Sequence, residues 1–283
     1  MAWSLLLFVL GWLLLARLTT LADLKQAWSK SLGLGLPLLL LLAMPAVSHF
    51  VKMLGWRSLL PVEVRPPIST AYATFIAAQG VNELGFSVLG EPLKIWVLPR
   101  DARATGLRAV LADNLAALAA LFAVIASLSR LGAGVVSPAL RATVACSCLA
   151  LVVLVLWRAR AERWSGLLSA FLAHYFGKLW LVVELGLGLY FLGQPALAQA
   201  PTLALAWLGA AAIGAPVPGQ LGVVEAALVK TGTSLGLALS SLLALALVRR
   251  LRSLVWVVVG LSLAARIVSK RTEGKGHVSI ATA

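Results

Sequence analysis

The segment LLSAFLAHYFGKLWLVVELGLGLYFL, residues 167–192, is the clearest indication of the fold class of this chain. It is longer than the ~20 residues that an α-helix needs to cross the ~30 Å hydrocarbon core of a bilayer. It nevertheless contains His174, Lys178 and Glu184, and ionisable side chains within a membrane segment usually face the interior of a helix bundle. The stretch therefore predicts a transmembrane helix with ionisable side chains directed into the protein.

Seven further apolar stretches lie along the chain. They are residues 2–16, 32–47, 68–89, 107–128, 142–157, 202–217 and 235–267, the last interrupted by Arg249, Arg250 and Arg252. We expect the last stretch to split into two short segments at these arginines. Lipid permits only helices or closed barrels, and runs of this length without alternation exclude barrel strands. The expected fold class is all-α, a polytopic helical membrane bundle.

The composition of the 283 residues leads to the same conclusion. Apolar residues make up 61% of the chain and charged residues 12%, whereas a soluble domain carries about 25% charged residues. So few charges cannot cover a water-exposed surface, which excludes a water-soluble enzyme, a nucleic-acid-binding domain and a disordered chain. The net charge of +14 comes from basic residues at the connectors, where they anchor helices at the membrane edge.

We expect one integral membrane domain, residues 1–268, followed by a short basic tail, residues 269–283. The first apolar stretch lacks the basic n-region and the A-x-A site of a cleaved signal peptide. Basic connectors favour a cytoplasmic N-terminus, whereas the basic tail argues against it. Cys146 and Cys148 are two residues apart, so on a helix they point to different faces and predict neither a disulfide nor a metal pair.

Two windows of the chain, residues 67–91 and 201–225, align without a gap. They read PISTAYATFIAAQGVNELGFSVLGE and PTLALAWLGAAAIGAPVPGQLGVVE. Besides two alanine pairs, the identical positions are Pro67 with Pro201, Gly80 with Gly214, Gly85 with Gly219, and Glu91 with Glu225. The match predicts an internal repeat that relates the two halves by pseudo-symmetry.

Glycine and proline interrupt both windows. The residues are Gly80, Gly85, Gly90, Gly214, Pro216, Pro218, Gly219 and Gly222. Apolar segments interrupted at corresponding places in two halves are typical of broken or re-entrant helices, whose free backbone groups need protein or a water-filled cavity. We expect both windows to re-enter the membrane and to meet at a polar cavity. Alternatively, each window is an ordinary helix whose small residues allow close packing.

Several acidic side chains lie inside or at the margins of the apolar stretches, where each costs ~3 kcal/mol on insertion scales. Glu91 and Glu225 end the two windows, so we expect them to bind substrate or to carry a coupling proton in the shared cavity. Glu83, beside Asn82, either lines the cavity or caps the broken helix.

Three more ionisable residues are secondary candidates. Asp113, next to Asn114, is interpreted as part of a buried structural pair or as a functional residue, and Glu184 as the ion-pair partner of a basic side chain. His174 lies four residues before Lys178, so the two share a helix face.

Basic residues near these acids are candidate phosphate ligands. Lys94 follows Glu91 and Lys230 follows Glu225, while Lys178 lies well inside its apolar stretch. Arg249 and its neighbours are most simply interfacial anchors, although a guanidinium is also the best bidentate partner for a phosphate.

The chain lacks the G-x-x-x-x-G-K-[ST], H-E-x-x-H, C-x-x-C and G-x-S-x-G motifs. We therefore expect no catalytic residue, no metal and no cofactor. Movement of a lipid is favoured over chemistry on a lipid.

Two motifs resemble those of the lysylphosphatidylglycerol synthase transmembrane family, a group of flippase-like membrane proteins. VNELGFSVLGEPLKIWVLPR, residues 81–100, resembles the first signature, and PVPGQLGVVEAALV, residues 216–229, resembles the second. Asp113 after RAVLA also fits, although a Glu that often precedes it is missing. The resemblance implies two re-entrant hairpins and the movement of an anionic or zwitterionic lipid headgroup between leaflets, without a fused synthase domain.

The leading hypothesis is a flippase or transporter for a phospholipid, a polyprenyl-phosphate-linked lipid or a hopanoid-related lipid, in the bacterial inner membrane. Lys94, Lys178 and Arg249 would attract the headgroup phosphate. The alternatives are a membrane-embedded transferase acting on a polyprenyl phosphate, with Glu83 or Glu91 as the base, and a noncatalytic partner of a lipid biosynthesis complex. Expected partners are membrane lipids, a second copy of the chain or a lipid biosynthesis enzyme, and no nucleic acid.

Overall fold

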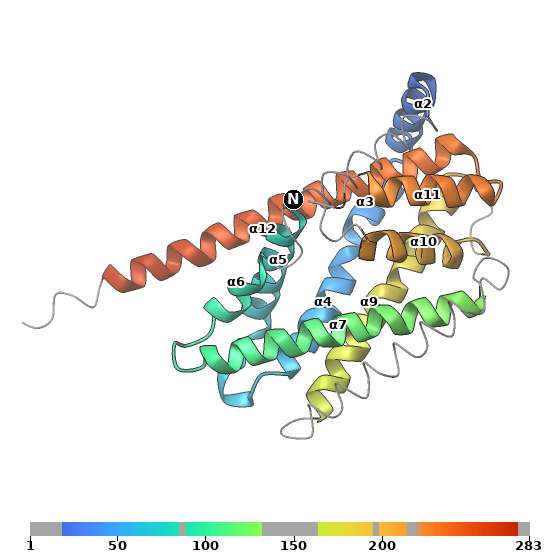
Figure 1. Cartoon of the computed structure of the whole chain (residues 1–283). Coiled ribbons are helices and arrows are strands. Elements are labelled where there is room, and N and C mark those ends of the chain that lie inside the picture. The colour runs from blue at the N-terminus through green and yellow to red at the C-terminus, as the bar shows by residue number, and fades with distance from the viewer. Residues whose placement is uncertain are drawn as a thin grey trace, which may run out of the picture.

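A computed structural model describes residues 19–84, 89–131, 164–194, 198–213, 220 and 222–276. These residues form helices joined by turns, with no strand among them (Figure 1). The helices are α2 (Leu21–Leu32), α3 (Leu36–Ala43), α4 (Pro45–Ser58), a 3₁₀ turn η1 (Val62–Val64), α5 (Ile68–Leu84), α6 (Glu91–Trp96), α7 (Arg103–Leu131), α9 (Trp164–Phe191), α10 (Ala200–Ile213), α11 (Val223–Ser234) and α12 (Leu239–Gly276).

Four helical segments of this structure are long and apolar enough to cross a membrane. They are Leu36–Ser58, Arg103–Ser129, Gly166–Phe191 and Leu239–Ser269. Their outer faces keep large apolar side chains exposed, for example Leu39, Leu172 and Leu254. Such faces are stable against acyl chains and costly against water. The predicted helical membrane bundle is confirmed, while the stretches 2–16 and 142–157 lie outside the described residues.

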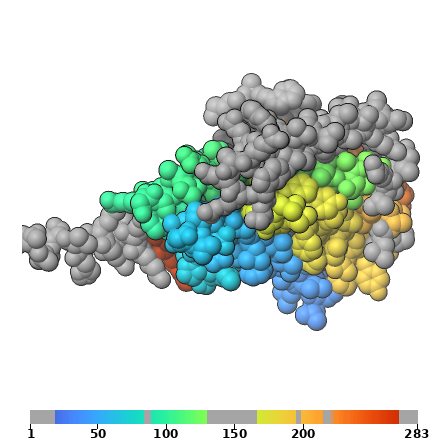
Figure 2. Space-filling view, turned by 90° about the horizontal axis from the view of Figure 1, so that it is seen from below, coloured from blue at the N-terminus to red at the C-terminus, as the bar shows by residue number. Residues whose placement is uncertain are grey.

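A ring of helix contacts forms the centre of the bundle. α4 packs side by side with α9 (Figure 1, and the blue and yellow surfaces in Figure 2), α4 also touches α5, and α12 contacts both α5 and α9. Gly55 permits a close approach of α4 to α9, because a Cβ built on it would lie 2.8 Å from the Cβ of Ala173. α4, α5, α9 and α12 therefore surround a common space.

The last apolar stretch does not split at its arginines. α12 continues unbroken from Leu239 to Gly276, and it extends past the other helices (Figure 1). Arg249 and Arg252 both pair with Glu184 of α9, so these guanidinium groups need not reach the membrane edge. The prediction of two short segments is therefore wrong.

Each repeat window contains one helix followed by the start of another. α5 precedes α6, whose first residue is Glu91, and α10 precedes α11, whose first turn holds Glu225. The shared order agrees with the proposed repeat without establishing it, and the re-entrance of the windows stays a prediction. Of the interrupting residues, Gly85, Gly214, Pro216, Pro218 and Gly219 lie outside the described residues.

Three of the interrupting glycines lie within the described residues, and they act in two different ways. Gly80 was predicted to break its helix, but α5 continues through it to Leu84. Gly90 precedes α6, where a Cβ would overlap the carbonyl oxygen of Ala78. Gly222 precedes α11 with a φ of 81°, a left-handed conformation that favours glycine. Close packing explains the first two and backbone conformation the third.

Candidate functional site

A cavity of about 210 Å³ occupies the space inside the helix ring. Residues of α4, α5, α9, α10 and α12 line it. Its charged lining residues are Lys52, Glu83, Lys178, Glu184, Arg249 and Arg252, which we call the cationic cavity. Four bases against two acids leave an excess of two positive charges when every group is ionised.

Glu184 forms its ion pairs with the two arginines of the cavity. Its Oε2 lies 3.3 Å from Arg249 Nη1 and also contacts Arg252 Nη1. Arg249 stacks in addition on Trp207 of α10, with 3.9 Å from the guanidinium carbon to the ring centroid. Glu184 brings one negative charge against two guanidinium groups, so the excess of positive charge in the cavity is shared by the arginines and the lysines.

Lys52 and Lys178 form no ion pair or hydrogen bond within the described part of the chain. Lys52 extends from α4 across α9 at Gly177, where a Cβ would overlap the Lys52 side chain. Lys178 is the next residue of α9, and both lysines line the cavity. Two unpaired ammonium groups at membrane depth are costly, so the site favours an anion between them.

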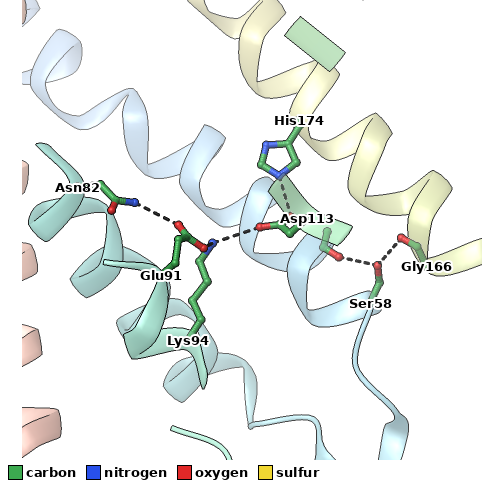
Figure 3. Close-up of polar contacts among 8 residues, drawn as sticks. Ser58, Asn82, Glu91, Lys94, Asp113, Gly166 and His174 are labelled. Carbon is green, nitrogen blue, oxygen red and sulfur yellow. Dashed lines mark hydrogen bonds and ion pairs between the residues drawn. The ribbon is translucent and has the colours of Figure 1, made fainter. Parts of the chain in front are cut away.

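A chain of polar contacts connects α5, α6, α7 and α9 next to the cavity (Figure 3). Lys94 Nζ lies 3.0 Å from Glu91 Oε2 and 3.2 Å from Asp113 Oδ2. His174 Nε2 lies 2.8 Å from Asp113 Oδ1. Lys94 and Asp113 are almost completely buried, at 2% and 1% exposure. We call Glu91, Lys94, Asp113 and His174 the buried charge chain.

Asn82 positions the first member of this chain. Its amide nitrogen donates to Glu91 Oε1 at 3.2 Å, while its carbonyl oxygen accepts from the backbone N–H of Gly90 at 2.6 Å. Asn82 thus joins the end of α5 to the beginning of α6. The Lys94 ammonium also lies 4.7 Å from the ring centroid of Phe75, which adds a cation–π contact.

The structure distributes the predicted binding residues over separate places. Glu83, Lys178 and Arg249 line the cationic cavity, whereas Glu91, Lys94 and Glu225 are not among its lining residues. Glu225 accepts from the backbone N–H of Gly222 at 2.9 Å and pairs with Arg250. Each window glutamate is thus bound by a basic side chain close to it and neither lines the cationic cavity, while a cavity common to both stays a prediction.

Other interpretations are corrected or confirmed individually. Asp113 does not pair with Asn114, which is exposed, since the Asp113 carboxylate binds Lys94 and His174. Glu184 is an ion-pair partner of basic side chains, as predicted. Arg249 is buried against Glu184, so its interpretation as an interfacial anchor is wrong.

Lys52, His49 and Arg252 line the cavity but were not expected to do so. The apolar stretch 32–47 ends before Lys52, whereas α4 continues to Ser58. The spacing of His49, Lys52 and Trp56 along one helix face could have revealed that the helix continues past residue 47.

Within the described residues, no group of three or more His, Cys, Asp or Glu side chains could hold a metal ion.

Comparison with protein-family models, with curated proteins and with solved structures gives no match for this chain. The resemblance to the lysylphosphatidylglycerol synthase transmembrane family therefore rests on the two motifs alone.

Proposed function

We propose that this protein is a lipid flippase or transporter that binds the anionic headgroup of a membrane lipid in the cationic cavity. The observation that carries the proposal is the pair Lys52 and Lys178, two lysines without a carboxylate partner in a cavity within the helix ring. A headgroup phosphate supplies the counter-charge that they lack. The site of action is the bacterial cytoplasmic membrane in this proposal.

The size of the cavity limits what enters it. Pockets for drug-sized ligands measure about 300–1,000 Å³, and the cavity measures about 210 Å³. It can hold a phosphate-sized headgroup but not two acyl chains. The tails of a bound lipid would remain in the surrounding bilayer while the headgroup occupies the protein.

Arg249 and Arg252 have a different role in this proposal. Both are held by Glu184, so their positions are fixed before a ligand arrives. A preorganised guanidinium loses little conformational freedom on binding an oxyanion. Lys52 and Lys178 would supply net attraction, and the arginines would supply directed hydrogen bonds.

A reconstitution experiment tests the proposal. Purified protein is placed in liposomes that contain trace fluorescent phosphatidylglycerol or a fluorescent polyprenyl phosphate, and the fraction accessible to an added reductant is followed. We expect faster exchange between leaflets than in protein-free liposomes. Lys52→Gln and Lys178→Gln should each slow it strongly, and Lys230→Gln, at an exposed lysine outside the cavity, should not.

The proposal would be contradicted if neither lipid exchanged between leaflets, or if the double variant Lys52→Gln/Lys178→Gln kept full activity.

The rival function, a transferase acting on a polyprenyl phosphate, is favoured by Glu83, a carboxylate that lines the cavity beside the cations. Mass spectrometry of the lipid after incubation with a candidate acceptor distinguishes the transferase from the transporter. A new covalent product supports the transferase, and an unchanged lipid on the opposite leaflet supports transport.

A further inference from the structure

The buried charge chain has an unbalanced charge when His174 is neutral. The Glu91 and Asp113 carboxylates bring two negative charges, and Lys94 brings one positive charge. One proton on His174 makes the set neutral. Because a net charge in a buried site is costly, a proton on His174 stabilises the buried charge chain by neutralising it.

The cationic cavity opposes that proton. His174 precedes Lys178 by one helical turn on the same face of α9, about 6 Å between Cβ atoms. Lys52 and Lys178 form no ion pair within the described residues, so their ammonium groups repel a further positive charge on His174. An anion between the two lysines removes most of this repulsion.

We infer that the His174–Asp113 pair takes up one proton when an anionic headgroup enters the cationic cavity. The inference rests on the proposed anion site and adds proton coupling to it. Anion and proton then bind cooperatively, and by thermodynamic linkage each increases the affinity of the protein for the other. The proton site lies in the buried charge chain, outside the residues that line the cavity.

The geometry assigns an atom to each proton. Nε2 of neutral His174 carries a hydrogen, because it faces the Asp113 carboxylate oxygen at 2.8 Å and that oxygen accepts. The incoming proton is transferred from water to Nδ1, which has no hydrogen-bond partner within the described residues. The resulting imidazolium keeps its bond to Asp113, and no covalent bond between heavy atoms is made or broken.

Three of the helices packed against α9 carry charged or titratable groups on the His174 side or around the cavity. α7 provides Asp113, α4 provides Lys52 and His49, and α12 provides Arg249 and Arg252, while α9 itself provides Lys178 and Glu184. Lys94 and Glu91 of α6 act through Asp113, Arg103 and Arg108 lie farther along α7, and α3 and α10 carry no charged residue. The arginines of α12 are bound to Glu184 and Lys94 is bound to two carboxylates. Lys52 and Lys178 are therefore the charges whose effect on His174 changes most when an anion binds.

Calorimetry in detergent micelles tests the inference, with dioctanoyl phosphatidylglycerol as the probe. Titration in two buffers with different ionisation enthalpies measures the protons taken up per bound lipid. We expect net uptake in the unaltered protein. The affinity should be about tenfold higher at pH 5.5 than at pH 8, the effect of two unit charges ~10 Å apart at an effective dielectric constant of ~20.

Two histidine variants locate the proton. His174→Gln keeps an N–H directed at Asp113 but cannot titrate, so it should bind the probe without proton uptake. His49→Gln, at a histidine that lines the cavity, should keep the uptake. Binding by the unaltered protein without uptake would overturn the inference and leave the anion site intact. Loss of uptake in His49→Gln, or its persistence in His174→Gln, would overturn the assignment to His174.

Failure of the unaltered protein to bind the probe would instead contradict the proposed anion site, and the coupling inference would fall with it. The pH dependence of binding by the unaltered protein also tests the inference if His174→Gln does not fold. Equal affinity at pH 5.5 and pH 8 would overturn it without any variant.

Discussion

Gly80 of α5 and Gly260 of α12 lie in direct backbone contact: a Cβ built on Gly80 would lie 2.8 Å from the Cα of Gly260. Likewise, a Cβ built on Gly260 would lie 2.7 Å from the Cα of Gly80. Contacts between glycines bring helix backbones together in membranes, where packing rather than hydrophobic burial drives association. This crossing closes one side of the ring around the cationic cavity.

Adding one methyl group at this crossing should separate the helices. We expect Gly80→Ala and Gly260→Ala each to destabilise the protein by about 1–3 kcal/mol, because the new Cβ meets backbone and not a flexible side chain. The measurement is the thermal unfolding midpoint in detergent micelles. Gly209→Ala in α10 is the matched control, since its Cβ would meet nothing within 4 Å. Equal midpoints for Gly80→Ala and Gly209→Ala would contradict the close crossing.

Lys94 should be more important for stability than either acid it binds. Lys94→Met leaves Glu91 and Asp113 buried without their common cation, which costs roughly 3 to 5 kcal/mol. Glu91→Gln leaves Lys94 still paired with Asp113 and should cost clearly less. The thermal unfolding midpoint and the yield of folded protein measure the loss of stability in each variant. Partial recovery in Lys94→Met/Asp113→Asn would confirm that the loss comes from an unpaired charge, whereas no recovery would argue for lost packing.

Glu184 should be required to keep two arginines inside the bundle. Glu184→Gln removes the carboxylate that binds Arg249 and Arg252, and we expect a loss of roughly 3 kcal/mol or more in unfolding free energy. Glu63→Gln, the same change at an exposed glutamate of η1, is the control and should have no effect. Similar stability of the two variants would mean that water or lipid phosphate already compensates the arginines.

Gly177 should act on anion binding through Lys52. Gly177→Ala places a Cβ against the flexible end of the Lys52 side chain, so the lysine is displaced while the α4–α9 contact at Gly55 remains. We expect weaker binding of dioctanoyl phosphatidylglycerol and little change in unfolding temperature. In a Lys52→Gln background the same substitution should have no further effect on binding, and an additive loss in this double-mutant cycle would exclude the mechanism.

Hydropathy along the chain is sufficient to predict a helical membrane protein. Hydropathy is a sum over neighbouring residues, so apolar stretches such as 107–128 and 167–192 identify spans without knowledge of any contact. The cost of a buried charge also made Glu184 identifiable as an ion-pair partner before its partners were known.

Helix packing determines which charged side chains contact each other and which glycines face a neighbouring helix. Lys52 and Lys178 line the same cavity because α4 packs on α9 at Gly55 and Gly177. Asp113 binds His174 because α7 packs on α9. The repeat windows drew attention to Glu91 and Glu225, yet both are bound by bases close to them. The pairing energy of an ion depends on distances of a few ångströms between side chains of different helices, which hydropathy and local motifs do not contain.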